Sequence, residues 1–303
     1  MLMKTYQIPK NLQQGDAIGI LSTARKITVD ELNPAIKWIE KQGFNAVLGR
    51  TLTLTDGQFA GTAEQRAEDF QRMLEKPNIK AIWCARGGYG TAQILDQIDF
   101  SPLRKNPKWV IGYSDVTALH SHIHNIGLAT LHATMPINIL ENTPQALSSL
   151  LNVLCGQPNH YQWEDTQSTH TKQELEGIVV GGNLSVLYSL LGSPSDIDTN
   201  GKILLLEDLD EYLYHIDRMM LNLKRNGKLK KLKALLVGSF TKMHDNACPY
   251  GKTVAEIILE NTKDYDFPIV FDVPSGHIHD NRAFILGKKI KLCTDGKDCQ
   301  ILM

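Results

Sequence analysis

The chain has 303 residues, with 32 Lys plus Arg against 33 Asp plus Glu, so its formal net charge at pH 7 is -1. This near-neutral balance lacks the basic surface that binds phosphate backbones, so no nucleic-acid partner is expected. Hydrophobic residues make up 42% and charged residues 21% of the chain, which is typical of a globular protein with a sizeable core. A chain of this length is expected to form two domains.

Cysteine usage and the lack of long apolar runs indicate where the protein resides. The five cysteines are scattered and contain no Cys-x-x-Cys pair, so neither a disulfide framework nor a zinc knuckle is predicted. Residues 1–14 lack the continuous apolar core of a signal peptide. No apolar run approaches the length of a membrane span. The sequence therefore predicts a soluble, cytoplasmic protein without a membrane partner.

Short apolar segments alternate with helical patterns in the first half of the chain. Strands are predicted at 17–22, 46–49, 79–85 and 109–113. The clearest helix starts with the capping-box spacing of Thr62 and Gln65. This alternation predicts βαβ units and a parallel sheet, with ligands gathered at the carboxyl ends of its strands.

The second half of the chain mixes its elements differently. Residues 142–174 are polar and contain Gly156 and Pro158, so they predict a linker or crossing segment. Buried strands are predicted at 203–206, 234–240 and 269–272, a terminal antiparallel meander at 283–286, 290–293 and 300–303, and helices at 184–191, 212–225 and 254–261. The predicted fold is α/β with an N-terminal parallel-sheet domain at 1–155, a linker at 156–175 and a C-terminal mixed domain at 176–303.

The first candidate for chemistry is Ser114, in the run Gly-Tyr-Ser-Asp that ends the strand 109–113. A serine at a sharp strand-to-helix turn exposes its hydroxyl beside the free N–H groups of the helix start. Position 116 is Val116 and not glycine, so the α/β-hydrolase pattern is not met. On this run alone, a helix-capping serine is the favoured interpretation.

The second candidate is the segment 86–90, Arg-Gly-Gly-Tyr-Gly, which directly follows the strand 79–85. A glycine-rich turn at a strand end can aim N–H groups at a phosphate or an oxyanion. No Gly-Lys-Ser/Thr follows, so a nucleotide P-loop is not supported. A structural tight turn remains an equal interpretation of this segment.

The third candidate is Glu207, which follows the four aliphatic residues 203–206 and is therefore expected at the rim of a sheet. Asp210 and Glu211 lie nearer a helix start, where they favour the helix dipole. Acidic clusters of this kind are usually solvated, so this segment alone does not indicate a catalytic carboxylate.

The fourth candidate is His277, in a loop that follows the strand 269–272. His277 and His279 would lie on one side of an extended loop, so a metal-dependent hydrolase completed by Asp208 or Asp210 is a rival hypothesis. The plainest interpretation is a single loop histidine bonded to the backbone. Four histidines of the first half of the chain are expected to be helix-surface or packing residues, because no acid partner is spaced to support them: His120, His122, His124 and His132.

Together the four segments supply complementary parts at strand ends, in the chain order Ser, Glu, His. A serine hydroxyl needs a neighbouring base, because it is a poor nucleophile at neutral pH. That base in turn needs a buried carboxylate that fixes its tautomer. The combination predicts a hydrolase with Ser114 as nucleophile, His277 as base and Glu207 as its orienting partner.

At these residues the chain resembles the LD-carboxypeptidase family, the muramoyltetrapeptide carboxypeptidases of serine peptidase family S66. The similar segments lie in the family's order at 15–20, 59–62, 86–90, 112–115, 181–184, 206–208, 216–219 and 276–277, together with Arg66 and Asp69. This resemblance runs almost from end to end of the chain.

The resemblance implies a Ser-His-Glu triad on Ser114, His277 and Glu207, with the backbone N–H groups of Gly88 and Asp115 as the oxyanion hole. It implies an N-terminal domain like that of class I glutamine amidotransferases, a homodimer, and no metal or other cofactor. The implied reaction releases terminal D-Ala from murein tetrapeptides in the cytoplasm, during cell-wall recycling. A related activity within the family, hydrolysis of microcin-type peptidyl nucleotides, is the alternative.

The sequence offers several candidates for substrate binding and does not select among them. Arg86, Arg218 and backbone donors near Asn183 are the candidates for binding the terminal carboxylate of the substrate. One segment departs from the family, since residues 132–135 read His-Ala-Thr-Met where members often have His/Ser-Gly-Pro-Met. This departure bears on substrate range more than on the type of reaction.

Overall fold

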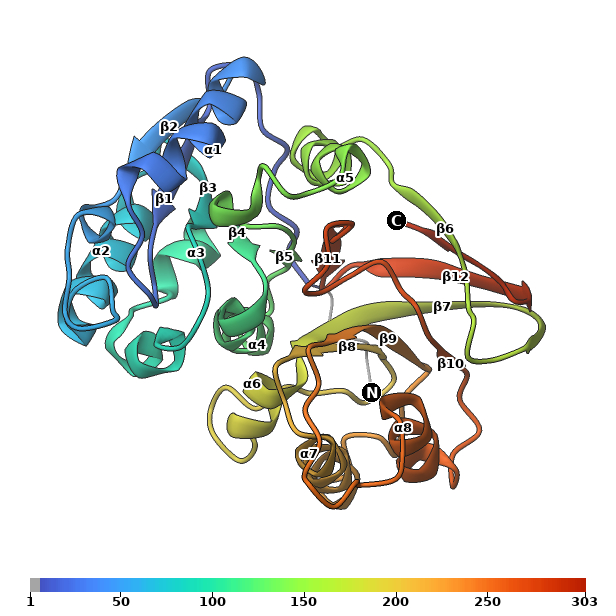
Figure 1. The fold of residues 1–303 in the computed structure, drawn as a ribbon. Helices are drawn as coiled ribbons and strands as arrows, with labels where there is room; N and C mark the ends of the chain where they lie inside the picture. Colours follow the sequence, from blue (N-terminus) through green and yellow to red (C-terminus); the bar gives the residue numbers. More distant parts are fainter. Residues whose placement is uncertain (1–5) are drawn as a thin grey trace.

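The computed structural model describes residues 6–303, so the prediction for residues 1–14 lies partly outside the described range. Five strands of the first half of the chain and one strand near its end, β11, form a six-stranded sheet in the order β11-β5-β4-β3-β1-β2 (Figure 1). Its strands are β1 (Ala17–Leu21), β2 (Asn45–Leu48), β3 (Ile79–Cys84), β4 (Trp109–Gly112), β5 (Thr130–His132) and β11 (Phe284–Leu286). All neighbouring strands are parallel except β11, which runs antiparallel to β5.

Helices cover both faces of this sheet, which is why its strands are short and apolar. The helices are α1 (Val29–Lys41), α2 (Ala63–Glu75), α3 (Ser101–Lys105), α4 (Thr117–Asn125) and α5 (Pro144–Cys155). Side chains of α1 and α5 pack in one core cluster, and those of α2, α3 and α4 pack in the other. The predicted capping box of Thr62 and Gln65 is confirmed at the start of α2.

The second sheet has seven strands in the order β10-β9-β8-β7-β12-β13-β6. Its strands are β6 (His160–Glu164), β7 (His170–Asn183), β8 (Ile203–Leu209), β9 (Ala234–Thr241), β10 (Ile269–Val270), β12 (Lys289–Gly296) and β13 (Asp298–Leu302). The run from β7 to β10 is parallel, whereas β7, β12, β13 and β6 pair antiparallel. The helices of this half are α6 (Leu184–Ser189), α7 (Leu213–Arg225) and α8 (Val254–Thr262).

Four short 3₁₀ turns complete the described elements: η1 (Arg50–Leu52), η2 (Thr91–Gln97), η3 (Ser114–Val116) and η4 (Pro136–Asn138). The expected α/β architecture with parallel strands in two domains is confirmed. No helix within residues 6–303 combines the length and apolarity that a bilayer crossing demands.

Two details of the predicted organisation differ from the structure. The stretch 156–175, expected as a linker, holds β6 and the first residues of β7, because its polar side chains belong to strands that alternate between exposed and buried positions. The stretch 283–286, expected within a terminal meander, forms β11 and joins the first sheet beside β5. The last third of the chain therefore crosses back into the N-terminal half (Figure 1).

The two halves meet beside α4. This helix packs against β7 and α6 of the second half, and the Thr117 Oγ1 accepts a hydrogen bond of 3.0 Å from the backbone N–H of Asn183. The carboxyl ends of β3 and β4 thereby face the carboxyl end of β8, where the candidate residues lie.

Candidate active site

Ser114 occupies a strained backbone position directly after β4. Its φ angle is 61°, in the left-handed region that a residue with a Cβ adopts at a cost. The turn η3 starts at Ser114 and leads into α4, so the residue lies between a strand end and a helix start. Strain of this kind is typical of a nucleophile held on a sharp strand-to-helix turn.

The glycine-rich loop after β3 approaches the side chain of Ser114 closely. A Cβ added at Gly87 would lie 3.2 Å from the Cβ and 3.3 Å from the Oγ of Ser114. Gly88 and Asp115 line the same cavity as Ser114. The Asp115 carboxylate supports this loop, because its Oδ2 accepts a 2.9 Å hydrogen bond from the backbone N–H of Thr91. Burial raises the pKa of the Asp115 carboxyl.

Glu207 and His277 form a buried hydrogen-bonded pair. The Nδ1 of His277 lies 2.7 Å from the Oε2 of Glu207. The Glu207 side chain is fully buried, whereas 13% of the His277 side chain is exposed. The imidazole therefore lines the cavity, and the carboxylate lies beneath it. Glu207 of β8 and His277 of the loop after β10 therefore meet although they lie 70 positions apart in the chain.

A glycine lets the His277 loop pass over Glu207. Gly276 has a φ of 109°, and a Cβ there would lie 2.8 Å from the Cβ of Glu207 and 2.5 Å from the Oγ of Ser239. Any larger residue would push the loop, and with it His277, away from the carboxylate. The glycine of the Ser-Gly-His run is thus required by this close approach.

Charges around the pair act on its protonation. Burial of the His277 ring works to lower its pKa, but the charge and hydrogen bond of Glu207 and the charge of Asp208 together outweigh burial and raise the pKa of His277 above its usual 6.5. Burial, followed by the charge of Glu207, raises the pKa of Asp208 to about 7. The Tyr113 ring lies 4.8 Å from the His277 ring, and burial raises the pKa of Tyr113.

Charged side chains of both signs line the cavity over Ser114. Its volume is about 490 Å³, and its lining includes Arg25 and Arg86 from the first half of the chain. The second half contributes the acidic residues Asp208, Asp210 and Glu211. A second cavity of about 540 Å³ shares the His277 side of the first and is lined by Lys242, Glu141 and His279 among others. His277 therefore borders two cavities.

The candidate substrate contacts have different surroundings. Arg86 lines the cavity of Ser114, and its Nη1 donates to the carbonyl of Lys26 at 3.2 Å. Asn183 also lines it, but its Nδ2 donates to the Asp208 carboxylate at 3.0 Å and its Oδ1 caps α6. Arg218 lies on α7 with its guanidinium 5.1 Å from the centre of the Tyr214 ring, and it is not among the residues that line the cavity.

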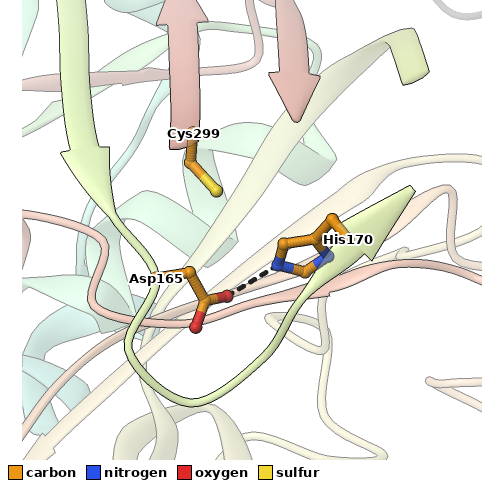
Figure 2. Close-up of side chains that lie close together, drawn as sticks. All are labelled: Asp165, His170 and Cys299. Atoms are coloured by element: carbon orange, nitrogen blue, oxygen red, sulfur yellow. Dashed lines mark hydrogen bonds and ion pairs between the residues drawn. The ribbon is translucent and has the colours of Figure 1, made fainter. Parts of the chain in front are cut away.

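The rival metal site needs a third ligand beside His277 and His279. Across residues 6–303, three His, Cys, Asp or Glu side chains bring ligand atoms within 4.8 Å of one another at one place, Asp165, His170 and Cys299 (Figure 2). Asp165 and His170 lie at the β6–β7 connection and Cys299 lies on β13, and the cluster does not include His277. The predicted Asp208 and Asp210 do not complete such a set in the described part of the chain.

The Asp165 cluster fits a loop anchor better than a cation site. One carboxylate oxygen of Asp165 accepts two backbone N–H groups of its own loop. The other accepts the backbone N–H of Phe271 at 2.9 Å and the His170 Nε2–H at 2.7 Å. Burial raises the pKa of the Cys299 thiol to about 12, which opposes the thiolate that a metal would need.

The sequence interpretation missed three residues at this site. Arg25 and Lys242 line the two cavities, but neither follows a predicted strand in a recognisable motif. His132 was expected to be a packing residue without an acid partner; it is fully buried, and its Nε2 lies 4.0 Å from the Oε1 of Glu207. Only the departure at 132–135 from the family pattern pointed to this segment.

We expect Gly87→Ala to lower kcat roughly tenfold to hundredfold, because the new Cβ would press on the Ser114 side chain. The φ of Gly87 lies outside the left-handed region, so alanine fits the backbone and Tm should move by no more than about 4 °C. Steady-state kinetics and thermal unfolding test this. Unchanged kcat would show that the loop does not constrain the Ser114 hydroxyl.

Comparisons with known proteins find similarity over most of the chain. The models of the LD-carboxypeptidase N-terminal and C-terminal domains match residues 18–133 and 176–292. The chain is 34% identical to a probable murein peptide carboxypeptidase of Bacillus subtilis, over 97% of this chain and 93% of the relative. It is 32% identical to the murein tetrapeptide carboxypeptidase of Pseudomonas aeruginosa, over 89% and 91%.

One further relative and one solved structure are also similar to the chain. The Microcin C7 self-immunity protein MccF of Escherichia coli is 26% identical, over 96% of this chain and 94% of the relative. The crystal structure of a muramoyltetrapeptide carboxypeptidase from Oxalobacter formigenes superposes with a TM-score of 0.85 at 25% identity, over 94% of this chain and 98% of that chain.

Proposed function

Since the chain belongs to the LD-carboxypeptidase family, we propose that it is a serine carboxypeptidase that releases the terminal D-Ala from murein tetrapeptides. The observation that carries the proposal is the buried Glu207–His277 pair in the cavity of the strained Ser114. We further propose that the protein acts as a homodimer in the cytoplasm, in cell-wall recycling.

In the proposed mechanism, the Ser114 Oγ attacks the scissile carbonyl carbon while His277 takes the hydroxyl proton. Glu207 holds the imidazole through its Nδ1 and stabilises the imidazolium. The backbone N–H groups of Gly88 and Asp115 bind the oxyanion. His277 then protonates the leaving amine of D-Ala, and water hydrolyses the acyl-enzyme ester with His277 again as base.

Charge in the cavity supports a substrate that bears both signs. A carboxypeptidase must bind a free carboxylate, and Arg86 is our candidate, helped by Arg25 from the same half of the chain. The acidic residues that the second half of the chain contributes would bind the ammonium group of a diamino acid in the murein peptide. Asn183 is assigned to positioning Asp208, since its amide already donates to that carboxylate.

Hydrolysis of a peptidyl nucleotide is the second candidate function. It is favoured by the full-length similarity to the MccF self-immunity protein, although that identity of 26% is lower than the 34% and 32% of the murein carboxypeptidases. Both reactions would use the same three side chains, so the substrate decides between them.

The deciding experiment is incubation of the purified protein with a murein tetrapeptide and, separately, with an aspartyl sulfamoyl adenosine. Release of D-Ala from the first and a slower or absent reaction with the second is the expected result. Cleavage of the nucleotide alone would favour the second function. Binding of the tetrapeptide without D-Ala release, together with no cleavage of the aspartyl sulfamoyl adenosine, would overturn both functions. Loss of activity with a chelator would instead support the metal hypothesis.

A further inference from the structure

Two buried polar atoms beside the Glu207–His277 pair face each other without a hydrogen-bond partner. Among the described residues, neither the Oε1 of Glu207 nor the Nε2 of His132 has a hydrogen bond, and both atoms are inaccessible to solvent. The distance between them is 4.0 Å. A buried carboxylate oxygen without a donor is costly, so this arrangement calls for an explanation.

His132 is held firmly in this position by its strand. It ends β5 between two neighbours, paired with Gly112 on β4 and Phe284 on β11. Its side chain is fully buried. The ring therefore cannot turn towards water, and its two nitrogens must find partners inside the protein.

The neighbour of its other nitrogen decides the tautomer of the ring. The Nδ1 of His132 lies 3.3 Å from the hydroxyl oxygen of Ser275. If Ser275 donates to Nδ1, the proton of the neutral ring is on Nε2 and points at Glu207. The opposite tautomer would set a nitrogen lone pair against a buried carboxylate, which is electrostatically unfavourable.

We propose that His132 is a positioning residue of the catalytic site, whose neutral ring donates its Nε2–H to the second carboxylate oxygen of Glu207. The 4.0 Å separation is longer than a hydrogen bond, and such catalytic contacts often shorten only when substrate is bound. With His277 on Oε2 and His132 on Oε1, the carboxylate is held from both sides. The effect on catalysis rests on the proposed function, whereas the contact itself does not.

The ring of His132 acts through its dipole and not through a charge. Burial, followed by the nearby His120 and His277, lowers the pKa of His132 to about 3, so the ring is neutral at working pH. The positive end of its N–H dipole then opposes the attraction of Glu207 for the His277 imidazolium. Without this donor, the carboxylate should hold that imidazolium more strongly, and the pKa of His277 should rise.

Other charged and titratable groups face the same pair, and all of them are unchanged in the His132 variants. Tyr113 of β4 lies 4.8 Å from His277 and 6.0 Å from His132, measured between ring centres. His120 of α4 lies 6.3 Å from His132. Beyond burial and Glu207, the charge of Asp208 raises the pKa of His277 and that of Lys242 lowers it.

The test compares His132→Met with His132→Gln, two flexible side chains of similar size of which only Gln carries a donor. We expect kcat to fall about tenfold to hundredfold in His132→Met and to recover largely in His132→Gln. The acid limb of kcat/KM should move to higher pH in His132→Met alone. The matched control is His120→Met, which removes an equally buried imidazole bonded to the Gly112 carbonyl and should leave the acid limb in place.

A measurement without substrate separates this proposal from the proposed function. NMR titration of the His277 ring should show a pKa above the wild-type value in His132→Met and no such rise in His132→Gln. This result does not depend on whether D-Ala is a product. In the wild type, ¹⁵N shifts should show the proton of His132 on Nε2. A proton on Nδ1, or a His277 titration that is the same in both variants, would overturn the proposal. Absence of D-Ala release by the wild type would overturn only the proposed function.

Discussion

Replacing Ser114 by alanine is expected to lower kcat for D-Ala release by about 10⁶-fold, because no other hydroxyl replaces the attacking oxygen. Alanine keeps the Cβ at the φ of 61°, so the turn between β4 and α4 should survive with nearly unchanged stability. The measurement is single-turnover and steady-state release of D-Ala, with thermal unfolding as the check on folding.

The matched control for this variant is Ser121→Ala on α4, the helix that follows Ser114. The Ser121 hydroxyl is buried and donates to the carbonyl of Ser195, away from the cavity, so its loss should cost stability but little activity. If Ser114→Ala retained more than about a thousandth of the wild-type kcat, a nucleophile at this position would be ruled out.

Replacing Glu207 by glutamine is expected to lower kcat by about 10⁴-fold. The amide keeps the volume of a fully buried side chain, but it no longer attracts the imidazolium or fixes the His277 tautomer. The sign of the pH effect follows from the wild type, in which Glu207 raises the pKa of His277 against the effect of burial. Without that charge burial prevails, so the acid limb of kcat/KM should move to lower pH.

The pH profile distinguishes this role from a loss of folding. Glu176→Gln, which removes an exposed carboxylate paired with Lys289, should leave both kcat and the acid limb unchanged. An acid limb that stays in place in Glu207→Gln would show that another group sets the protonation of His277. The acid limb is expected to move to lower pH in Glu207→Gln and to higher pH in His132→Met. The two variants therefore test the electrostatic effect of Glu207 on His277 in opposite directions.

Much of the candidate site could be predicted from local sequence, because its parts follow short apolar strands. Ser114 and the 86–90 loop end neighbouring parallel strands, and such ends meet at one edge of a sheet. Glu207 was separated from Asp210 and Glu211 by its position after four aliphatic residues, and it is the acid that pairs with His277.

The rest depended on contacts between distant segments. His132 meets Glu207 only because β5 and β8 belong to domains that pack together, and nothing near position 132 in the chain signals a carboxylate. The path of β11 was missed for a similar reason, since an apolar triplet pairs equally well in either sheet and tertiary packing selects the partner.

The sequence by itself determined the fold class and the resemblance to the family, and it predicted a serine, a glutamate and a histidine as the catalytic residues. These follow from periodicity and short motifs, which are local properties of the chain. Only the tertiary structure decided which side of Glu207 each imidazole occupies and which charges line the cavity. Those properties depend on distances and burial between segments that the chain brings together only when both sheets have formed.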